Sequence, residues 1–401
     1  MARHRGPLFA AALLTLLTAC SGAGTVDGTE REGQASRQVA AAPREDVPSA
    51  LDDRENPAFP APLIDLDELR SGGPPPDGIP AIDDPKFEPA REVDWLADNE
   101  PVLALTVGGE TRAYPLRVMT WHEIVNDVVD GVPVAVTYCP LCNSGVAFER
   151  SVAGHGVLSF GTSGLLYADN LVMYDRQTES LWPQLTGQAS VGALTGTELV
   201  AIPMGTVSWH DFVSAEPRAF VLSQDTGFDR PYGTNPYTGY DDPNGELLFG
   251  LPGDLDTRLP VKERVVGLSD GAVSVAVVRS SLVGQPPLEV TVGQRHVVLW
   301  HRPGQASALD AETVAGGADI GTVGAFDPAL GGRRLHFEPR GTGFVDRETG
   351  SRWNVLGRST AGPLQGAEMK PYRHLDTFWF AWVTFHPDTE LLGSTNQKAA
   401  P

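Results

Sequence analysis

Positive charge is scarce in this 401-residue chain. Its 30 lysines and arginines are outnumbered by 51 aspartates and glutamates, which gives a formal net charge of −21. Because such a surface repels phosphate backbones and no basic stretch offsets it, we expect no nucleic-acid partner. The sequence also lacks a dinucleotide fingerprint, a phosphate-binding glycine loop and a complete G-x-S-x-G motif, since Leu165 stands where the last glycine would be. The sequence therefore shows none of these three common motifs of enzymes.

Long apolar runs are lacking as well. The run at residues 7–17 is too short to cross a membrane as a helix and follows Arg3 and Arg5, a pattern typical of a secretory signal peptide. The sequence LTAC at 17–20 resembles the lipobox of bacterial lipoproteins, which implies cleavage before Cys20 and acylation of its sulfur. Two or more acyl chains make a durable anchor. We expect residues 1–19 to be the signal peptide, and lipid such as palmitate on Cys20 to hold the protein on the extracytoplasmic side of the cell membrane.

Cysteine is limited to three residues, so only Cys139 and Cys142 remain once Cys20 carries lipid. An extracytoplasmic compartment permits a disulfide between them. The chain from Cys20 to residue 56 is rich in Gly, Ala, Ser, Glu and Arg, with almost no large apolar side chains. Such a segment cannot bury enough apolar surface to fold, so we predict a disordered tether over residues 20–56.

The chain resembles itself at a distance of about 170 residues. Segments 174–182 and 345–353 share Asp, Arg, Thr, Ser and Trp in the same register, and residues 100–109 faintly resemble residues 263–271. Self-similarity on this scale predicts two internally duplicated halves. We assign a first repeat at 57–225, a Gly/Pro/Tyr-rich connector at 226–261, a second repeat at 262–393 and a tail at 394–401.

Short β-branched and aromatic runs separated by Gly, Pro and Asp predict a β-rich protein of mainly β or α+β class, with a few helices. The predicted strands are 102–107, 132–138, 146–148, 171–174, 273–278 and 296–300. One helix is predicted over residues 115–129, where Pro115 suits the first turn and an apolar stripe recurs at helical spacing.

Residues present in both repeats are best explained by a shared fold. They form two pairs at turns, Asp175 with Arg176 and Asp346 with Arg347, and two aromatic residues, Trp182 and Trp353. We interpret these six residues as structural.

Two motifs occur in the first half alone: WHEIVND at 121–127 and TYCPLCNSG at 137–145. Together with FGTSG at 160–164 and the Tyr-Asp-Arg and Leu-Trp pairs that follow, they resemble the family called domain of unknown function 3179. The resemblance covers nearly all of the chain after the predicted tether. It implies an extracytoplasmic or membrane-attached protein of bacterial or archaeal type, and it brings no established activity.

Cys139 and Cys142 are the chemically distinctive residues. A strand before Cys139 and a turn at 143–145 predict a strand-turn-strand knuckle, which suits a thiolate site for copper or zinc. His122 is the first candidate for a further metal ligand and Glu123 the second. Haem attachment is disfavoured because Asn143, not His, follows Cys142.

Two other interpretations stay open. The pair can serve as a thiol-disulfide redox centre, although the turn residues at 143–145 argue against a long helix there that would stabilise the thiolate. Alternatively, a disulfide can staple a turn in a non-enzymatic binding or scaffold module, whose protein partner the sequence does not identify. Whether the protein is an enzyme is left undecided by the sequence.

Overall fold

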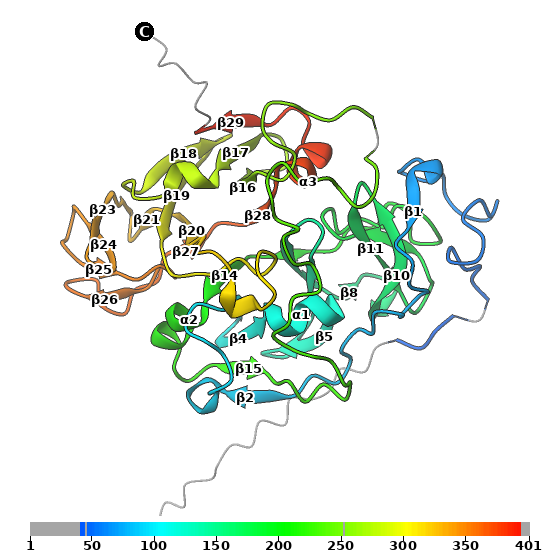
Figure 1. The fold of residues 1–401 in the computed structure, drawn as a ribbon, viewed down its shortest axis with the longest axis horizontal. Helices are drawn as coiled ribbons and strands as arrows, with labels where there is room; N and C mark the ends of the chain where they lie inside the picture. Colours follow the sequence, from blue (N-terminus) through cyan, green and yellow to red (C-terminus); the bar gives the residue numbers. More distant parts are fainter. Residues whose placement is uncertain (1–40, 45, 252, 394–401) are drawn as a thin grey trace, which may run out of the picture. The chain divides into compact units, whose positions relative to one another are not determined.

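The computed structural model of the protein describes residues 41–44, 46–251 and 253–393, and these form a β-rich fold (Figure 1). The signal peptide, Cys20, the beginning of the predicted tether and the tail at 394–401 lie outside the described residues. The prediction of a β-rich protein with a few helices is confirmed. No helix within the described residues is long and apolar enough to span a membrane.

The first half builds three larger sheets and a small hairpin. One sheet has the order β14 (Met204–Ser208), β3 (Pro101–Val107), β4 (Glu110–Pro115), β15 (Phe220–Leu222) and β2 (Phe87–Pro89). The second has the order β13 (Ala201–Ile202), β7 (Ser144–Glu149), β6 (Val132–Cys139) and β5 (Ile124–Val129). The third has the order β1 (Leu69–Ser71), β10 (Phe160–Tyr167), β11 (Asn170–Asp175) and β12 (Leu181–Pro183), and the hairpin pairs β8 (Ser151–Val152) with β9 (Gly156–Val157).

The second half builds a further three larger sheets and another small hairpin. One sheet has the order β28 (His374–Phe378), β16 (Arg264–Ser269), β17 (Ser274–Val278) and β29 (Glu390–Leu392). The next has the order β18 (Leu288–Val292), β19 (Arg295–Arg302), β20 (Thr322–Asp327) and β27 (Lys370–Pro371). The last has the order β23 (Phe337–Arg340), β24 (Gly343–Asp346), β25 (Arg352–Trp353) and β26 (Ser359–Ala361), and β21 (Ala329–Leu330) pairs with β22 (Arg333–Arg334).

The helices of the described chain are short. The α-helices are α1 (Leu116–His122), α2 (Trp209–Ala215) and α3 (Trp379–Phe385), and 3-10 turns occur at Leu66–Glu68, Ala90–Glu92, Arg279–Leu282 and Val314–Gly316. The predicted helix over 115–129 is therefore wrong beyond His122. Glu123 turns the chain with a positive φ of 58°, and the β-branched run that follows pairs with β6 as strand β5. The apolar positions assigned to a helical stripe fit a buried strand equally well, and pairing with β6 decides between them.

The two halves contain sheets of the same design. In the β14-β3-β4-β15 sheet and the β28-β16-β17-β29 sheet, the first two pairings are antiparallel and the last is parallel. Helix α2 lies between β14 and β15 in the chain, and helix α3 lies between β28 and β29. These correspondences do not by themselves confirm that the halves are duplicates, and the duplication stays a prediction.

Part of the segment predicted to be a disordered tether, residues 46–56, instead packs against the first half. Ala50 is fully buried in a cluster with Leu69 and Val172. Further along, the backbone N–H of Leu63 donates to the carbonyl of Ser190. The other boundaries proposed from the sequence stay predictions.

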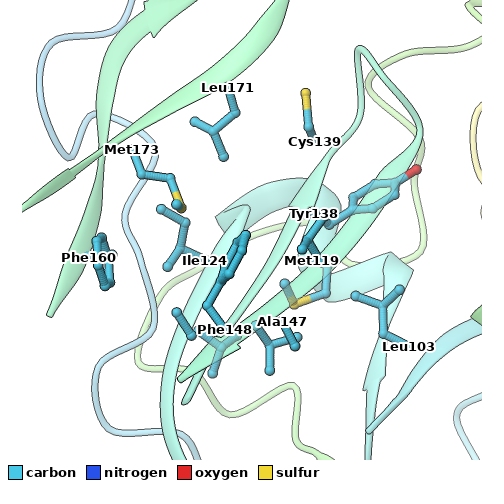
Figure 2. Packing of buried hydrophobic residues seen from close by; sticks show 14 of the residues in the cluster. Leu103, Met119, Ile124, Tyr138, Cys139, Ala147, Phe148, Phe160, Leu171 and Met173 are labelled. Atoms are coloured by element: carbon cyan, nitrogen blue, oxygen red, sulfur yellow. The ribbon is translucent and has the colours of Figure 1, made fainter. Parts of the chain in front are cut away.

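The largest hydrophobic cluster lies between the sheets of the first half and extends into the second. Figure 2 shows residues of this cluster, among them Cys139 and Tyr138 from strand β6. The second half contributes Leu309, Phe378 and Phe380 to the same cluster. The cysteine motif is therefore held against a core that both halves share.

Candidate functional site

Cys139 and Cys142 occupy a tight hairpin between β6 and β7. Cys139 is the last residue of β6 and pairs with Ser144, so four residues form the loop. Asn143 closes it with a positive φ of 50°, and its backbone N–H donates to the carbonyl of Pro140 at 3.1 Å. Asparagine tolerates this left-handed conformation better than most residues. The predicted strand-turn-strand knuckle is present, and no helix begins at Cys139.

Both cysteines are free thiols and are almost inaccessible to solvent. Cys139 is 1% exposed and Cys142 is 0% exposed, and no disulfide joins them. The thiol of Cys142 donates to the carbonyl oxygen of Asp169 at 3.4 Å and accepts from Nδ2 of Asn170 at 3.4 Å. Burial raises the pKa of Cys142 well above its ordinary value, and a hydrogen bond with the Cys139 thiol raises it further. The raised pKa favours the thiol form of Cys142, and the two sulfurs are neighbours.

Asp169 lies beside the cysteines at the tip of the β10–β11 hairpin. Ala168 and Asp169 have φ values of 52° and 58° and make the turn that links the two strands. The Asp169 side chain is buried, Oδ2 accepts a hydrogen bond from the hydroxyl of Tyr240 at 3.1 Å, and Oδ1 has no hydrogen-bond partner among the described residues. Burial raises the pKa of Asp169 to about 7, and the Tyr240 hydroxyl partly opposes that shift. This carboxyl group therefore titrates near neutral pH, next to Cys142.

The connector between the halves covers the site. Tyr240 is buried, and the Lys262 ammonium lies 4.0 Å from the centre of its ring. Lys262 Nζ also donates to the Tyr240 carbonyl at 2.5 Å, and its positive charge is close enough to Asp169 to lower that pKa. Lys262 thus supplies a buried positive charge close to the cysteines.

Glu123 is an unusual neighbour of the site. It follows α1 with a positive φ, is 7% exposed, and burial raises its pKa to about 8. Its carboxyl makes no hydrogen bond or ion pair to another described residue. Burial raises the pKa of Tyr237 in the connector, and electrostatic interactions with Glu123 and Cys139 raise it further, so the three groups lie close together.

His122 is occupied elsewhere. Nδ1 lies 2.7 Å from the carbonyl of Pro80, Nε2 lies 2.5 Å from the hydroxyl of Tyr232, and the ring packs on Phe228. Burial lowers the pKa of His122 and keeps the ring neutral. Across the described part of the chain, no three His, Cys, Asp or Glu side chains are grouped closely enough to hold a metal ion. The structure thus does not bring His122 or Glu123 together with the cysteines as a ligand set.

The six residues interpreted as structural lie in two matching turns. Asp175 accepts from the backbone N–H of Thr178 at 2.7 Å and from Trp182 Nε1 at 3.0 Å. In the second turn, Asp346 accepts from Thr349 at 2.6 Å and from Trp353 Nε1 at 2.9 Å. Both tryptophans are buried.

The arginines of these turns pair outside them. Arg176 forms ion pairs with Asp77 at 3.0 Å and Asp83 at 2.8 Å, and Arg347 pairs with Glu338 at 2.8 Å. Neither arginine pairs with the aspartate that precedes it in the chain.

Sequence reasoning missed four residues around the thiols: Asp169, Asn170, Tyr240 and Lys262. The pair Asp169-Asn170 between two apolar runs indicates a hairpin turn. Its contact with a cysteine 27 residues away depends on how the sheets pack. The connector residues Tyr240 and Lys262 carry no local signal for their position.

The comparisons with known proteins agree with the motifs. Residues 76–389 match the profile of the family described as "Protein of unknown function (DUF3179)". The chain belongs to this family. No curated protein and no solved structure matches the chain. Within this DUF3179 chain, the matched region includes the thiol pair, Asp169 and the connector.

Proposed function

We propose that Cys139 and Cys142 form a dithiolate site for a soft transition-metal ion, with Cu(I) as the cation whose preferences fit best. The observation that carries this proposal is the pair of free, neighbouring thiols on one hairpin knuckle. Thiolates select soft ions such as Cu(I). Cu(I) also accepts a low coordination number, so two sulfurs suffice, whereas a structural zinc site needs four ligands.

The charges around the pair support this choice. Binding converts two thiols and Cu(I) to a dithiolate complex of net charge −1, with release of two protons. The metal ion supplies the positive charge that a buried thiolate lacks, so it overcomes the raised pKa of Cys142. The amide N–H of Asn170 already donates to the Cys142 sulfur, and the nearby Lys262 ammonium offsets the remaining negative charge.

Zinc is a poorer fit. His122 uses both ring nitrogens in contacts with Pro80 and Tyr232, and the Glu123 carboxyl is protonated at neutral pH because its pKa is about 8. Recruiting either as a ligand requires breaking an existing contact or ionising a buried acid. A zinc site thus needs a rearrangement that a Cu(I) dithiolate does not.

A thiol-disulfide couple is the second candidate, and the hydrogen bond between the two cysteine thiols favours it. In this reaction the two thiols lose two electrons and two protons and form one S–S bond. A disulfide of a partner protein accepts the two electrons and two protons and becomes two thiols. The complete burial of Cys142 means that the connector must open for the partner to reach it.

We also propose that the protein is a lipoprotein of the cell membrane, facing the extracytoplasmic side. The support is the sequence at residues 17–20 and the apolar run before it. Incorporation of labelled palmitate into the full chain, and its loss in Cys20→Ser, tests this proposal. Labelling that persists in Cys20→Ser contradicts it.

The metal site is tested on the exported protein, purified without a histidine tag. Copper, zinc and iron per chain are measured by elemental mass spectrometry, and Cu(I) is then titrated from a chromophoric chelator. We expect about one copper per chain, lost in Cys139→Ser and Cys142→Ser and retained in the exposed control Ser151→Ala. Folding of each variant is checked by near-ultraviolet circular dichroism.

The outcomes separate the two candidates. Copper that survives both cysteine substitutions, or thiols that take up no Cu(I), overturns the metal proposal. A metal-free protein whose thiols equilibrate between dithiol and disulfide in a glutathione buffer supports the redox couple instead.

A further inference from the structure

A cavity of about 560 Å³ opens between the two halves, away from the cysteine side chains. Strand β7, the loop after β12, and strands β14 and β16 border it, together with the start of β28 and helix α3. Its polar and aromatic lining includes Thr186, Ser269, Arg373, His374, Trp382 and His386. Neither Cys139 nor Cys142 contributes to its wall. Its volume is within the range of small-molecule binding pockets.

Arg373 is the fixed positive charge of this cavity. Its side chain makes no hydrogen bond or ion pair with any described residue. The residue as a whole is exposed to solvent, and burial of its charged end within the cavity wall lowers its pKa. By contrast, Arg264 is paired with Asp241 and Arg279 with Asp376. A guanidinium that lines a cavity without a carboxylate partner, in a chain of net charge −21, lacks a counter-charge that an anionic ligand can supply.

Arg373 is the positively charged side chain among the titratable groups that line the cavity. Burial lowers the pKa of both His374 and His386, so both rings are neutral near pH 7. Asp270 is the one acidic residue among those that line the cavity, and its Oδ1 accepts from the backbone N–H groups of Ala272 and Val273 within its own exposed turn. These two backbone donors partly offset the negative charge of Asp270.

Another part of the lining is largely apolar and aromatic. Trp382 stacks on His386 with ring centres 3.9 Å apart, and its Nε1 donates to Thr389 at 2.9 Å. Leu375, Phe385 and Met204 complete an apolar surface beside it. A wall of this kind takes up the hydrocarbon or aromatic body of a ligand, while a polar group fixes its orientation.

We infer that this cavity binds a small organic anion, with its carboxylate or phosphate at Arg373 and its apolar body against Trp382 and Leu375. This site is separate from the proposed metal site and does not depend on it. A guanidinium forms two parallel hydrogen bonds to either kind of anionic group, so the chemistry shared by both is an oxyanion on an apolar chain.

The test measures binding of defined probes to the purified protein by isothermal titration calorimetry. Hexanoate and hexyl phosphate carry the two anionic groups on one chain, hexanol is the neutral match, and inorganic phosphate lacks the apolar body. We expect hexanoate or hexyl phosphate to bind at least about tenfold more tightly than hexanol and inorganic phosphate. The anion that binds better identifies the ligand class.

Variants locate the binding. Arg373→Gln is expected to weaken the better anionic probe about tenfold or more, Arg373→Lys to weaken it less, and the exposed control Arg333→Gln to leave it unchanged. Thermal unfolding confirms that each variant is folded. Equal binding of hexanol and the anions, no binding of either anion at millimolar concentration, or full affinity in folded Arg373→Gln overturns the inference.

Discussion

Two turns in this protein share Asp, Arg, Thr, Ser and Trp in the same register and have nearly the same hydrogen bonds, yet their aspartates differ in pKa. Asp175 and Asp346 each accept from a backbone N–H three residues on and from the indole of a tryptophan seven residues on. Burial raises the pKa of Asp175, because it outweighs the donors. At Asp346 the donors outweigh burial and the pKa is lowered. The hydrogen bonds follow from local sequence, whereas the sign of the shift follows from the surroundings.

The surroundings differ because an additional segment covers the first turn. Strand β1 pairs with β10 of the sheet that holds Asp175, and Ala50 packs in the same cluster as Leu181 and Val191. The sheet that holds Asp346 has only strands from its own stretch of chain. The first half also encloses Glu123 and Asp169, whose pKa values rise to about 8 and about 7. The half that carries the thiols is therefore the one in which burial raises the pKa of these carboxyl groups.

The largest expected difference between the two turns is in stability. Asp175→Ala leaves buried donors of Thr178, Ser180 and Trp182 without a partner, at a cost of about 4 kcal/mol in the free energy of unfolding. Asp346→Ala removes the same acceptor from the turn that no additional segment covers, and we expect a loss of about 2 kcal/mol. Urea-induced unfolding measures both. Equal losses in the free energy of unfolding mean that the covering segment does not add to the contribution of Asp175.

The pH dependence of stability tests the enclosure around Glu123. Its folded pKa of about 8 lies above the unfolded value, so the folded state binds the extra proton and wild-type stability falls as pH rises from about 4.5 to about 8. Glu123→Gln removes that loss, and we expect it to stabilise the protein by up to roughly 4 kcal/mol at about pH 9, with little effect at about pH 4.

A matched control exists for this experiment. Glu179 also has a positive φ, 53°, but is partly exposed. Glu179→Gln makes the same change from carboxyl to amide at a partly exposed position, and the pH dependence of Glu123→Gln is compared with it. A gain in Glu123→Gln that does not grow with pH shows that the Glu123 carboxyl is ionised in the folded protein.

The opposite pKa shifts of Asp175 and Asp346 predict that the stability costs of replacing them change with pH in opposite directions. Ionised Asp175 is disfavoured in the folded state, so the cost of Asp175→Asn shrinks as pH rises above about 3.9. Ionised Asp346 is favoured, so its contribution is present above the unfolded pKa and is lost as pH falls through the folded pKa. The cost of Asp346→Asn therefore grows as pH rises. Unfolding measured at about pH 3 and about pH 6 decides this, and parallel trends contradict the comparison.

How far the sequence predicts this protein depends on whether a feature is local. The predicted strands are present, and the knuckle at 139–142 forms as expected, because alternation of apolar residues and turn residues act over short distances. The predicted helix fails after His122, because pairing of β5 with β6 overrides a helical pattern.

The surroundings of the thiols depend on packing between distant segments. His122 appears in the same motif as Glu123, yet its ring points to Pro80 and Tyr232, while Asp169 and Tyr240 come to the cysteines from other parts of the chain. No spacing rule within the sequence connects residues 142, 169 and 240. The sequence thus predicts the cysteine pair of the candidate site but not the residues that packing brings to it.

The smallest expected effect tests whether the connector encloses the thiol site. Tyr240→Phe removes the hydroxyl that donates to Asp169, which raises the pKa of Asp169 further and lowers stability by about 1 kcal/mol. If the connector limits access, labelling of Cys139 and Cys142 by a thiol reagent under native conditions becomes roughly fivefold faster, because local opening costs less. Tyr237→Phe is the matched control, since the Tyr237 hydroxyl makes no hydrogen bond to a described residue. Equal labelling rates in the two variants mean that the reagent reaches the thiols by a route that does not involve the connector. The sheets of the first half, rather than the connector, then limit access to the thiols.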